Sequence, residues 1–241
     1  MRERLLVLTL VAALAGAAAG SVATSAFACV PGTEQRMGSG TRAYVATVLH
    51  SARAYRRPGG KVIRRFDRIS INGGPQVFAV VGRVVDGKCA TRWFHVQLPV
   101  RPNGANGFVH VFAVRLQSVR TRIRVDLKRR RLTFLRRGRV VLRTPVSIGT
   151  TATPTPKGTF YIKEAILTTS PGGPFGPGGL GLSSYSPVLL GWAQGGPIGI
   201  HGTDDPSSIG KARSNGCIRV PNAVARRLLA VVPLGTPVIV R

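Results

Sequence analysis

Short runs in which apolar and polar residues alternate dominate the chain from residue 42 to residue 118. These runs are rich in β-branched and aromatic residues, which is typical of strands that bury one face. They lie at 44–49, 76–81, 93–98 and 107–111. Turn-forming clusters separate them at 58–60, 72–75, 86–87 and 102–104. Several short strands at this spacing predict a small β-barrel or β-sandwich over 42–118.

A second domain is expected over 119–241, and it is also built mainly of strands. The strand-like runs lie at 122–127, 131–135, 140–142, 159–162, 198–201 and 236–240. The one clear helical pattern covers 220–232, where Pro221 suits the first turn. One face of this helix is apolar and carries Val224, Leu228, Leu229 and Val232. The pattern as a whole therefore predicts a mainly β chain with a single helix near its C-terminus.

The segment 170–181, with the sequence SPGGPFGPGGLG, interrupts this pattern. Its Pro and Gly content predicts neither a helix nor a central strand. We interpret it as a loop, either without a role or acting as a mobile cover over a site.

The N-terminal residues have the layout of a secretory signal peptide over 1–28. Residues 1–4 are net basic, residues 5–19 are apolar, and Ala26 and Ala28 offer a small-residue cleavage site. A polar, Gly-rich linker is expected over 29–41. Two alternatives stay open, since the apolar stretch is long enough for a membrane anchor and Cys29 could carry a lipid. Membrane contact is expected only in those two cases, and the mature protein is expected outside the cytoplasm, secreted or in the cell wall or periplasm.

A formal net charge of +27, from 35 basic and 8 acidic residues, points to anionic partners. Nucleic acid is the usual partner of so basic a chain, but a secretion signal argues against it. Outside a bacterium the available anions are wall polymers such as teichoic acids, peptide carboxylates and lipid headgroups. The alternative is that the Arg-rich composition reflects the composition of the genome.

The three cysteines, Cys29, Cys89 and Cys217, leave one thiol over in an oxidising compartment. A bond between Cys29 and Cys89 would leave Cys217 free, although the sequence does not prove that pairing. No C-x-x-C spacing is present and the four His are scattered, so no metal site is expected.

One stretch combines the residue types of nucleophilic catalysis. His201 precedes Cys217 by a loop that contains Pro and Gly, and Ser214-Asn215-Gly216-Cys217 has the composition of a tight turn. A thiol attacks a carbonyl only as its thiolate, so it needs a base or a positive setting. The helix that follows adds its positive end, and Arg219 can bind a carboxylate with two hydrogen bonds. The alternative is an inert buried Cys beside a structural His.

This stretch closely resembles the L,D-transpeptidase family of the YkuD type. The family pattern is His-Gly-Thr, a loop, and then Ser-His-Gly-Cys-Ile/Val-Arg/Asn, and the resemblance covers roughly 122–241. It is supported by the motifs at 147–149, 153–160 and 232–238. It implies a β-sandwich catalytic domain.

The resemblance also implies the roles of individual residues. Cys217 would be the nucleophile, His201 its base, and the carbonyl of Gly202 would orient the imidazole. The substrate would be bound by Ser214, Asn215 and Arg219, and the oxyanion by the N–H groups of Gly216 and Cys217. Asn215 stands where the family has a second His. If only the first His acts as base, activity should survive this change; if the second His tunes the thiol, a lower activity or a shifted pH optimum is expected.

The first domain resembles a bacterial SH3-like domain through Trp-x-x-Val-x-Leu-Pro at 93–99, an Asn-Gly turn, and Gly-Phe-Val at 107–109. Such modules in wall enzymes often bind peptidoglycan or space the catalytic domain.

The implied reaction is acyl transfer between peptidoglycan stem peptides, with release of D-Ala, a 3→3 cross-link and no cofactor. Three alternatives stay open. A cysteine peptidase or carboxypeptidase would use the same dyad with water as acceptor. A non-catalytic wall-binding protein would rely on the first domain. A factor that binds polyanions by charge alone would not need Cys217 and would lose binding with salt.

Overall fold

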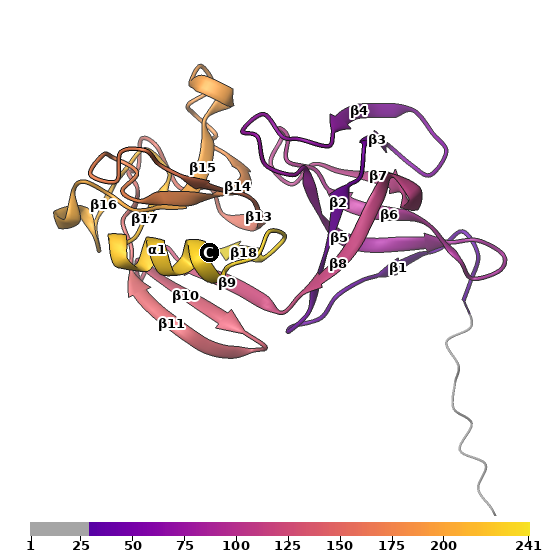
Figure 1. Cartoon of the computed structure of the whole chain (residues 1–241), viewed down its shortest axis with the longest axis horizontal. Helices are drawn as coiled ribbons and strands as arrows, with labels where there is room; N and C mark the ends of the chain where they lie inside the picture. Colours follow the sequence, from indigo (N-terminus) through magenta and orange to yellow (C-terminus); the bar gives the residue numbers. More distant parts are fainter. Residues whose placement is uncertain (1–28) are drawn as a thin grey trace, which may run out of the picture.

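The computed structural model describes residues 29–241, in which two β domains lie side by side (Figure 1). The predicted signal peptide over 1–28 lies outside the described residues. Across 29–241, none of the helices is both long enough and apolar enough to span a bilayer.

The first domain is one antiparallel sheet in the order β4-β3-β7-β6-β5-β2-β8, with β1 paired to β5. Its strands are β1 (Glu34–Arg36), β2 (Ala43–Val48), β3 (Ser51–Tyr55), β4 (Val62–Asp67), β5 (Val77–Val85), β6 (Thr91–Gln97), β7 (Asn106–His110) and β8 (Val114–Val119). The four predicted strands correspond to β2, β5, β6 and β7. A short 3-10 helix, η1 (Val111–Ala113), precedes β8. The specific resemblance to an SH3-like barrel stays a prediction.

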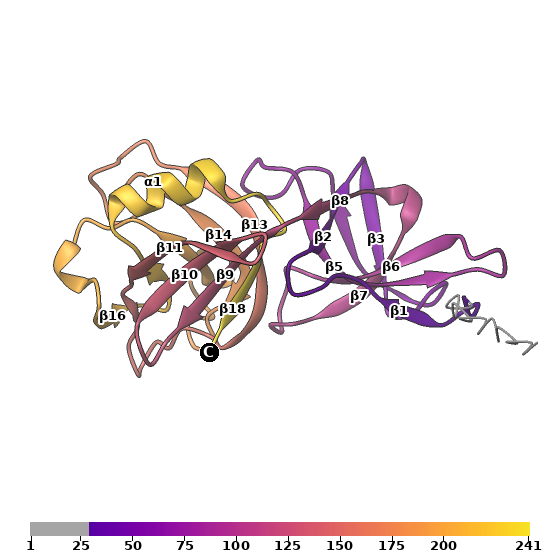
Figure 2. The same cartoon turned by 90° about the horizontal axis from the view of Figure 1, so that it is seen from below.

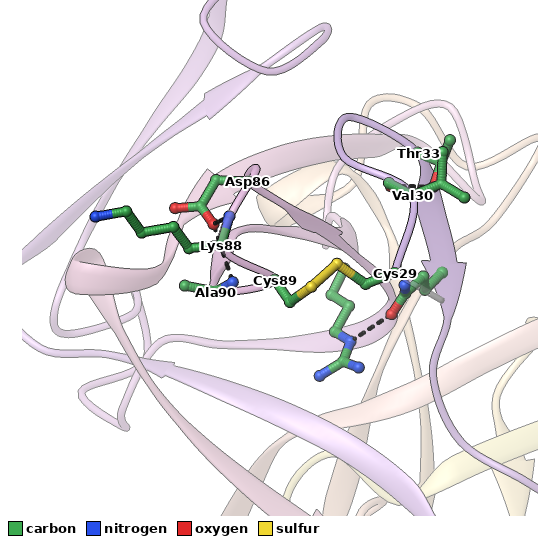
Figure 3. The surroundings of a disulfide bond; sticks show 9 residues. Cys29, Val30, Thr33, Asp86, Lys88, Cys89 and Ala90 are labelled. Atoms are coloured by element: carbon green, nitrogen blue, oxygen red, sulfur yellow. Dashed lines mark hydrogen bonds between the residues drawn. A yellow bond between two sulfur atoms is a disulfide. The ribbon is translucent and has the colours of Figure 1, made fainter. Parts of the chain in front are cut away.

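The expected linker over 29–41 is wrong in its central part. β1 pairs with β5 from Glu34 opposite Val84 to Arg36 opposite Gly82, so it belongs to the sheet. Cys29 forms a disulfide bond with Cys89, as one of the alternatives for its thiol expected (Figure 3). The turn that carries Cys89 is held by Asp86, whose Oδ1 accepts the backbone N–H groups of Lys88 and Ala90 at 2.9 and 3.0 Å. The segment over 29–41 is therefore attached to the first domain by a strand and a disulfide bond. The thiol of Cys29 is used in that bond and is not available for a lipid.

The second domain contains an eight-stranded sheet in the order β11-β10-β9-β18-β13-β14-β15-β17, together with the small pair β12-β16. The strands are β9 (Thr121–Asp126), β10 (Arg131–Arg136), β11 (Arg139–Pro145), β12 (Ile148–Gly149), β13 (Gly158–Leu167), β14 (Gly178–Tyr185), β15 (Pro197–His201), β16 (Ala212–Ser214), β17 (Ile218–Arg219) and β18 (Pro237–Val240). Two short 3-10 helices, η2 (Ala193–Gly195) and η3 (Pro206–Ser208), lie in its loops. The sheet combines antiparallel pairs with parallel pairs at β9-β18 and β15-β17. The mainly β fold with one α-helix is confirmed.

The single α-helix within residues 29–241, α1 (Asn222–Val231), packs against β14 and β15 (Figure 2). Leu228 and Val232 are buried and Arg226 and Arg227 are exposed, as the apolar face predicts. Pro221 is the residue that caps the helix rather than a residue of its first turn. The helix thus covers the strands that carry the site residues.

The expectation that 170–181 contains no central strand is wrong for its last residues. β14 begins at Gly178 and lies between β13 and β15. A Cβ on Gly179 would lie 2.6 Å from the Cβ of His201, and one on Gly181 would lie 2.5 Å from the Glu164 carboxylate. The glycines are there because neighbouring groups approach the strand closely, which composition alone did not distinguish from a chain break.

The two domains share a small apolar cluster formed by Val45, Val77, Val119 and Tyr161. The Tyr161 hydroxyl donates a hydrogen bond to the carbonyl of Val77 at 3.1 Å. The Gln97 side chain donates to the carbonyl of Thr159 at 2.9 Å. This interface joins the first sheet directly to β13 of the second.

Candidate active site

Strand pairing brings the predicted nucleophile and base to one edge of the second sheet. β15 and β17 are parallel neighbours, with Ile200 opposite Ile218 and His201 opposite Arg219. Cys217 immediately precedes β17, so it lies beside β15 diagonally from His201. Two residues separated by a long loop in the sequence are therefore brought to neighbouring strands of the sheet.

The turn before Cys217 has the sharp backbone that the sequence predicted. Gly216 has a φ of 111°, in the region that favours glycine. The Ser214 hydroxyl donates to the carbonyl of Cys217 at 2.5 Å and accepts the N–H of Gly216 at 3.2 Å. Ser214 is buried. Its contacts therefore fix the shape of the turn, and the N–H of Gly216 is engaged in it.

Two threonine hydroxyl groups, which the sequence interpretation missed, also hold this turn through hydrogen bonds to its backbone. The Thr155 hydroxyl donates to the carbonyl of Gly216 and accepts the N–H of Gly149, both at 2.8 Å. The Thr153 hydroxyl donates to the carbonyl of Ser214 at 3.1 Å. The Thr-Pro-Thr-Pro sequence at 153–156 lies in one of the motifs that support the family resemblance. Its two hydroxyl groups are the sequence signal from which this support of the turn could have been predicted.

His201 is buried and held in one tautomer. Its Nδ1 lies 2.6 Å from the carbonyl oxygen of Gly202, which can only accept, so Nδ1 carries the proton. This contact with Gly202 is the one expected from the family. The other ring nitrogen, Nε2, is therefore unprotonated in the neutral ring and can accept a proton.

The surroundings of His201 favour its neutral form. Burial lowers its pKa to about 4, with a further lowering from Arg219, and the hydrogen bond to Gly202 and the charge of Asp204 oppose this only in part. The ring of Phe175, on the loop before β14, lies edge-on to the imidazole with centroids 4.9 Å apart. The loop over 170–177 thus reaches the site, as the cover interpretation expected, although its mobility stays a prediction.

Cys217 is half-buried and is the free cysteine among the described residues. Burial raises the pKa of its thiol, while a backbone hydrogen bond from Gly199 and the charge of Arg219 lower it by less. Its Sγ lies 3.9 Å from the carbonyl oxygen of Pro197. Burial of the two groups therefore favours an uncharged thiol and a neutral imidazole over an ion pair.

Arg219 lies beside both groups and has unused hydrogen-bonding capacity. Its Nε is buried without a hydrogen-bond partner among the described residues. Its backbone N–H donates to the carbonyl of Ser147 at 3.0 Å and its carbonyl accepts the N–H of Ser147 at 2.9 Å, which fixes its position. A half-buried Arg that makes no salt bridge within residues 29–241 suits an anionic ligand.

Asn222, at the start of α1, is a further residue that the sequence interpretation missed. Its Oδ1 accepts the N–H of Thr203 at 2.8 Å and its Nδ2 donates to the carbonyl of Thr203 at 3.0 Å. These bonds tie the turn after His201 to the helix. A polar residue at the first helical position, next to Pro221, was the only signal for it.

The remaining predicted site residue, Asn215, is exposed at the tip of the cysteine turn. Residues 29–241 include no group of three or more His, Cys, Asp and Glu side chains that could hold a metal ion. The arrangement at the end of β15 and β17 is therefore a thiol, a neutral base with a fixed tautomer, and an unpaired cation.

Comparison with known proteins agrees with this geometry. Residues 120–240 match the family described as the L,D-transpeptidase catalytic domain, YkuD. The protein YkuD of Bacillus licheniformis, which its name assigns to the L,D-transpeptidases, is 43% identical over 117 residues, covering 48% of this chain and 63% of that protein. YkuD of Bacillus subtilis is 40% identical over 116 residues, with the same coverage of 48% and 63%.

A cysteine-to-serine mutant of the Enterococcus faecium L,D-transpeptidase is similar in structure, with 29% identity, a TM-score of 0.39, and coverage of 50% of this chain and 49% of that chain. The chain thus spans less than two thirds of the length of the curated relatives above, and its first domain lies outside the matched family region.

Proposed function

The chain belongs to the L,D-transpeptidase family through its YkuD-type catalytic domain, and from this premise we propose that it forms 3→3 cross-links between peptidoglycan stem peptides. The observation that carries the proposal is the fixed tautomer of His201, whose Nδ1–H is held by Gly202 at 2.6 Å. Because Cys217 immediately precedes β17, the strand paired with His201, we assign the free Nε2 of His201 as the base for its thiol.

In the first half of the reaction, the Cys217 thiol transfers its proton to Nε2 of His201. The sulfur attacks the carbonyl carbon of the third residue of a tetrapeptide stem, diaminopimelate or lysine. The backbone N–H of Cys217 would donate a hydrogen bond to the resulting oxyanion. The N–H of Gly216 would donate a second one after it releases the Ser214 hydroxyl. The C–N bond to D-Ala then breaks, and the imidazolium returns the proton to the departing amine.

In the second half, the side-chain amine of another stem attacks the thioester. Neutral His201 takes a proton from that amine, the C–S bond breaks, and the proton returns to the sulfur. The product is an amide between two third residues, and the enzyme is restored without a cofactor. The lowered pKa of His201, about 4, keeps the ring neutral and its Nε2 free at neutral pH, although a base whose pKa lies nearer the working pH would accept a proton more readily.

The positive charge of the protein fits the substrate. Arg219, with its buried Nε unpartnered in the described part of the chain, would bind a stem carboxylate beside the thiol. We propose that Ser214 shapes this acyl-donor site through the turn and that Asn215 lines its entrance. Attraction between the many exposed basic groups and wall anions would add a salt-sensitive contribution.

We also propose an extracytoplasmic location. The Cys29–Cys89 disulfide supports it, because such bonds persist in oxidising compartments and are rare in the cytoplasm. L,D-transpeptidases are generally cell-wall enzymes, which agrees with this location.

The deciding experiment is mass spectrometry of products after the protein, as residues 29–241, is mixed with a disaccharide-tetrapeptide. Cys217→Ala is the matched control. Loss of D-Ala together with a new cross-linked dimer, absent in the control, is the expected result. Release of D-Ala without a dimer would replace the proposal with a carboxypeptidase, and no Cys217-dependent product would leave a wall-binding protein.

A further inference from the structure

The loop over 186–196, between β14 and β15, lies next to the nucleophile but is held largely by the other domain. It leads directly into Pro197, whose carbonyl oxygen is 3.9 Å from the Cys217 sulfur. Its two ends are joined by a hydrogen bond from the Ser186 N–H to the Gly196 carbonyl at 2.8 Å. In Figure 1 it extends beyond β14 and β15 at the top of the second domain.

Arg101, in the first domain, binds both ends of this loop through one nitrogen atom. Its Nη2 donates to the carbonyl of Ser186 at 2.7 Å and to the carbonyl of Gly195 at 2.6 Å. Gly195 is two residues before Pro197. A single cation from the neighbouring domain therefore fixes the backbone immediately before the residue that contacts the nucleophile.

The strand that leads into the loop is bound by the same segment of the first domain. Asn103 donates to the carbonyl of Tyr185 and accepts its N–H, both at 2.8 Å. The Tyr185 hydroxyl donates to the carbonyl of Pro99 at 2.6 Å. The Arg101 guanidinium lies over the Tyr185 ring, 5.4 Å from its centroid. Residues 99–103 thus bind both Tyr185 and the two ends of the loop.

A third residue of the first domain reaches the far side of the loop. The Asn72 side chain accepts a hydrogen bond from Gln194 at 2.9 Å and donates to the buried carboxylate of Glu164 at 2.7 Å. Gln194 has a positive φ of 56°, a conformation that is uncommon for residues other than glycine. The contact with Asn72 supports the loop at the position where its own backbone is least favourable.

The middle of the loop presents large apolar side chains to solvent. Val188, Leu190 and Trp192 are 49%, 65% and 53% exposed. These three apolar residues belong to the loop that leads into Pro197, whose carbonyl oxygen is 3.9 Å from the Cys217 sulfur, and exposed apolar side chains are suited to the alanine methyl groups and the methylene chain of a stem peptide. Binding is stronger when such a loop is held in place before the ligand arrives, because the conformational entropy of the loop is not lost on binding.

We propose that the first domain holds the loop over 186–196 as one wall of the stem-peptide groove, and that Arg101 is its principal positioning residue. This inference rests on the proposed function for the identity of the ligand. The first domain then contributes to catalysis without supplying a catalytic residue. Loss of Arg101 should raise KM for the tetrapeptide several-fold and change kcat much less, because the dyad itself stays intact.

The test uses Trp192 as a reporter. Trp93 and Trp192 are the two tryptophans of the chain, so a Trp93→Phe background leaves a signal from the loop alone. In that background, Arg101→Ala should lower the fluorescence anisotropy of Trp192 and raise its quenching by acrylamide. Arg101→Lys should restore most of the parental signal, since both bonds come from one nitrogen that a lysine can replace. Arg53→Ala is the matched control, because Arg53 is an exposed residue of β3 whose side chain makes no hydrogen bond or salt bridge within residues 29–241.

A second measurement avoids the Trp93→Phe background. Chymotrypsin cleaves after exposed aromatic and leucine residues, so Leu190 and Trp192 are natural cleavage sites in the otherwise unmodified chain. Cleavage within 186–196 should become several-fold faster in Arg101→Ala and stay unchanged in Arg53→Ala. An unchanged Trp192 signal and unchanged cleavage in Arg101→Ala would overturn the proposal, as would equal changes in the Arg53→Ala control.

Kinetics on the tetrapeptide complete the test. A higher KM in Arg101→Ala, largely reversed in Arg101→Lys, supports the loop as a substrate wall. A loosened loop with unchanged KM would overturn that part of the proposal. The fluorescence and cleavage measurements need no turnover, so a loosened loop in a protein without any Cys217-dependent product would reject the proposed function and leave the domain contact standing.

Discussion

The two sides of the active site are built in different ways. The cysteine side is held within its own domain by buried hydroxyl groups, with Thr155 bound to Gly149 and Gly216 and Ser214 bound to Cys217. The loop side is held across the domain interface by exposed residues of the first domain. Buried hydrogen bonds are costly to break, whereas solvent can replace exposed ones.

This difference separates two tasks. The positions of the thiol and base are set by contacts that persist as long as the catalytic domain is folded. The wall over 186–196 is set by contacts that can be removed without disturbing the dyad. Substitutions on the cysteine side should therefore affect kcat and stability, and substitutions on the loop side should affect KM.

The largest expected effect is on the cysteine side, from His201→Gln. A positioned general base contributes about 10²–10⁴-fold, so kcat for dimer formation should fall by about that factor. Steady-state kinetics by mass spectrometry measures this, with Cys217→Ala as the zero point. A variant that keeps more than a tenth of the parental kcat would mean that His201 is not the base.

The next effect is the pH dependence of stability that follows from the burial of His201. Its folded pKa is about 4, below the value of 6.5 expected when unfolded. The folded state therefore favours the neutral ring, so this stability is fully present above pH 6.5 and is lost as the pH falls toward 4. A difference of this size is worth about 3 kcal/mol between pH 7 and pH 4.

Urea unfolding at several pH values measures this effect. The parent should lose about 3 kcal/mol more than His201→Gln between pH 7 and pH 4. The same comparison on Arg101→Ala should keep the parental pH dependence, because the loop side does not contact the imidazole. Equal slopes for the parent and His201→Gln would contradict the lowering of the His201 pKa by burial.

A smaller effect is expected from Thr155→Val, which removes the hydroxyl beneath the cysteine turn. The N–H of Gly149 and the carbonyl of Gly216 would lose their buried partner, at a cost of about 1–3 kcal/mol in unfolding free energy. A displaced turn should also lower kcat more than it changes KM. Thr159→Val, at an exposed position of β13, is the matched control and should stay within about 0.5 kcal/mol of the parent. A stable Thr155→Val variant with normal kcat would show that the turn does not depend on this hydroxyl.

The smallest effect is expected on the loop side, from Asn72→Ala. The contact with Gln194 is exposed, and the buried Glu164 carboxylate keeps Lys163 at 3.0 Å, so the change should cost about 0.5–1.5 kcal/mol of stability, and KM should rise about twofold with kcat unchanged. Asn106→Ala is the control, because that side chain bonds only to Gly104 within its own domain. A fall in kcat at constant KM would contradict the division of tasks between the two sides.

The sequence was sufficient where the physical cause is local. Alternation predicted β2, β5, β6 and β7, and the one apolar helical face predicted α1 to within two residues at its start and one at its end. The positive φ of Gly216 followed from a turn composition next to the thiol. The strand β14 was missed because its glycines are required by close contacts with His201 and Glu164, which are distant in the sequence.

For the candidate site, the sequence alone gives the chemistry of the groups, namely the thiol of Cys217, the imidazole of His201 and the guanidinium of Arg219 within a short stretch. Only the tertiary structure decided the tautomer of His201 and the burial that lowers its pKa, because both depend on what surrounds the ring. It also decided that Thr155 and Asn222 support the site and that Arg101 reaches across from the other domain. Such contacts join residues far apart along the chain, and a pattern of neighbouring residues contains no record of them.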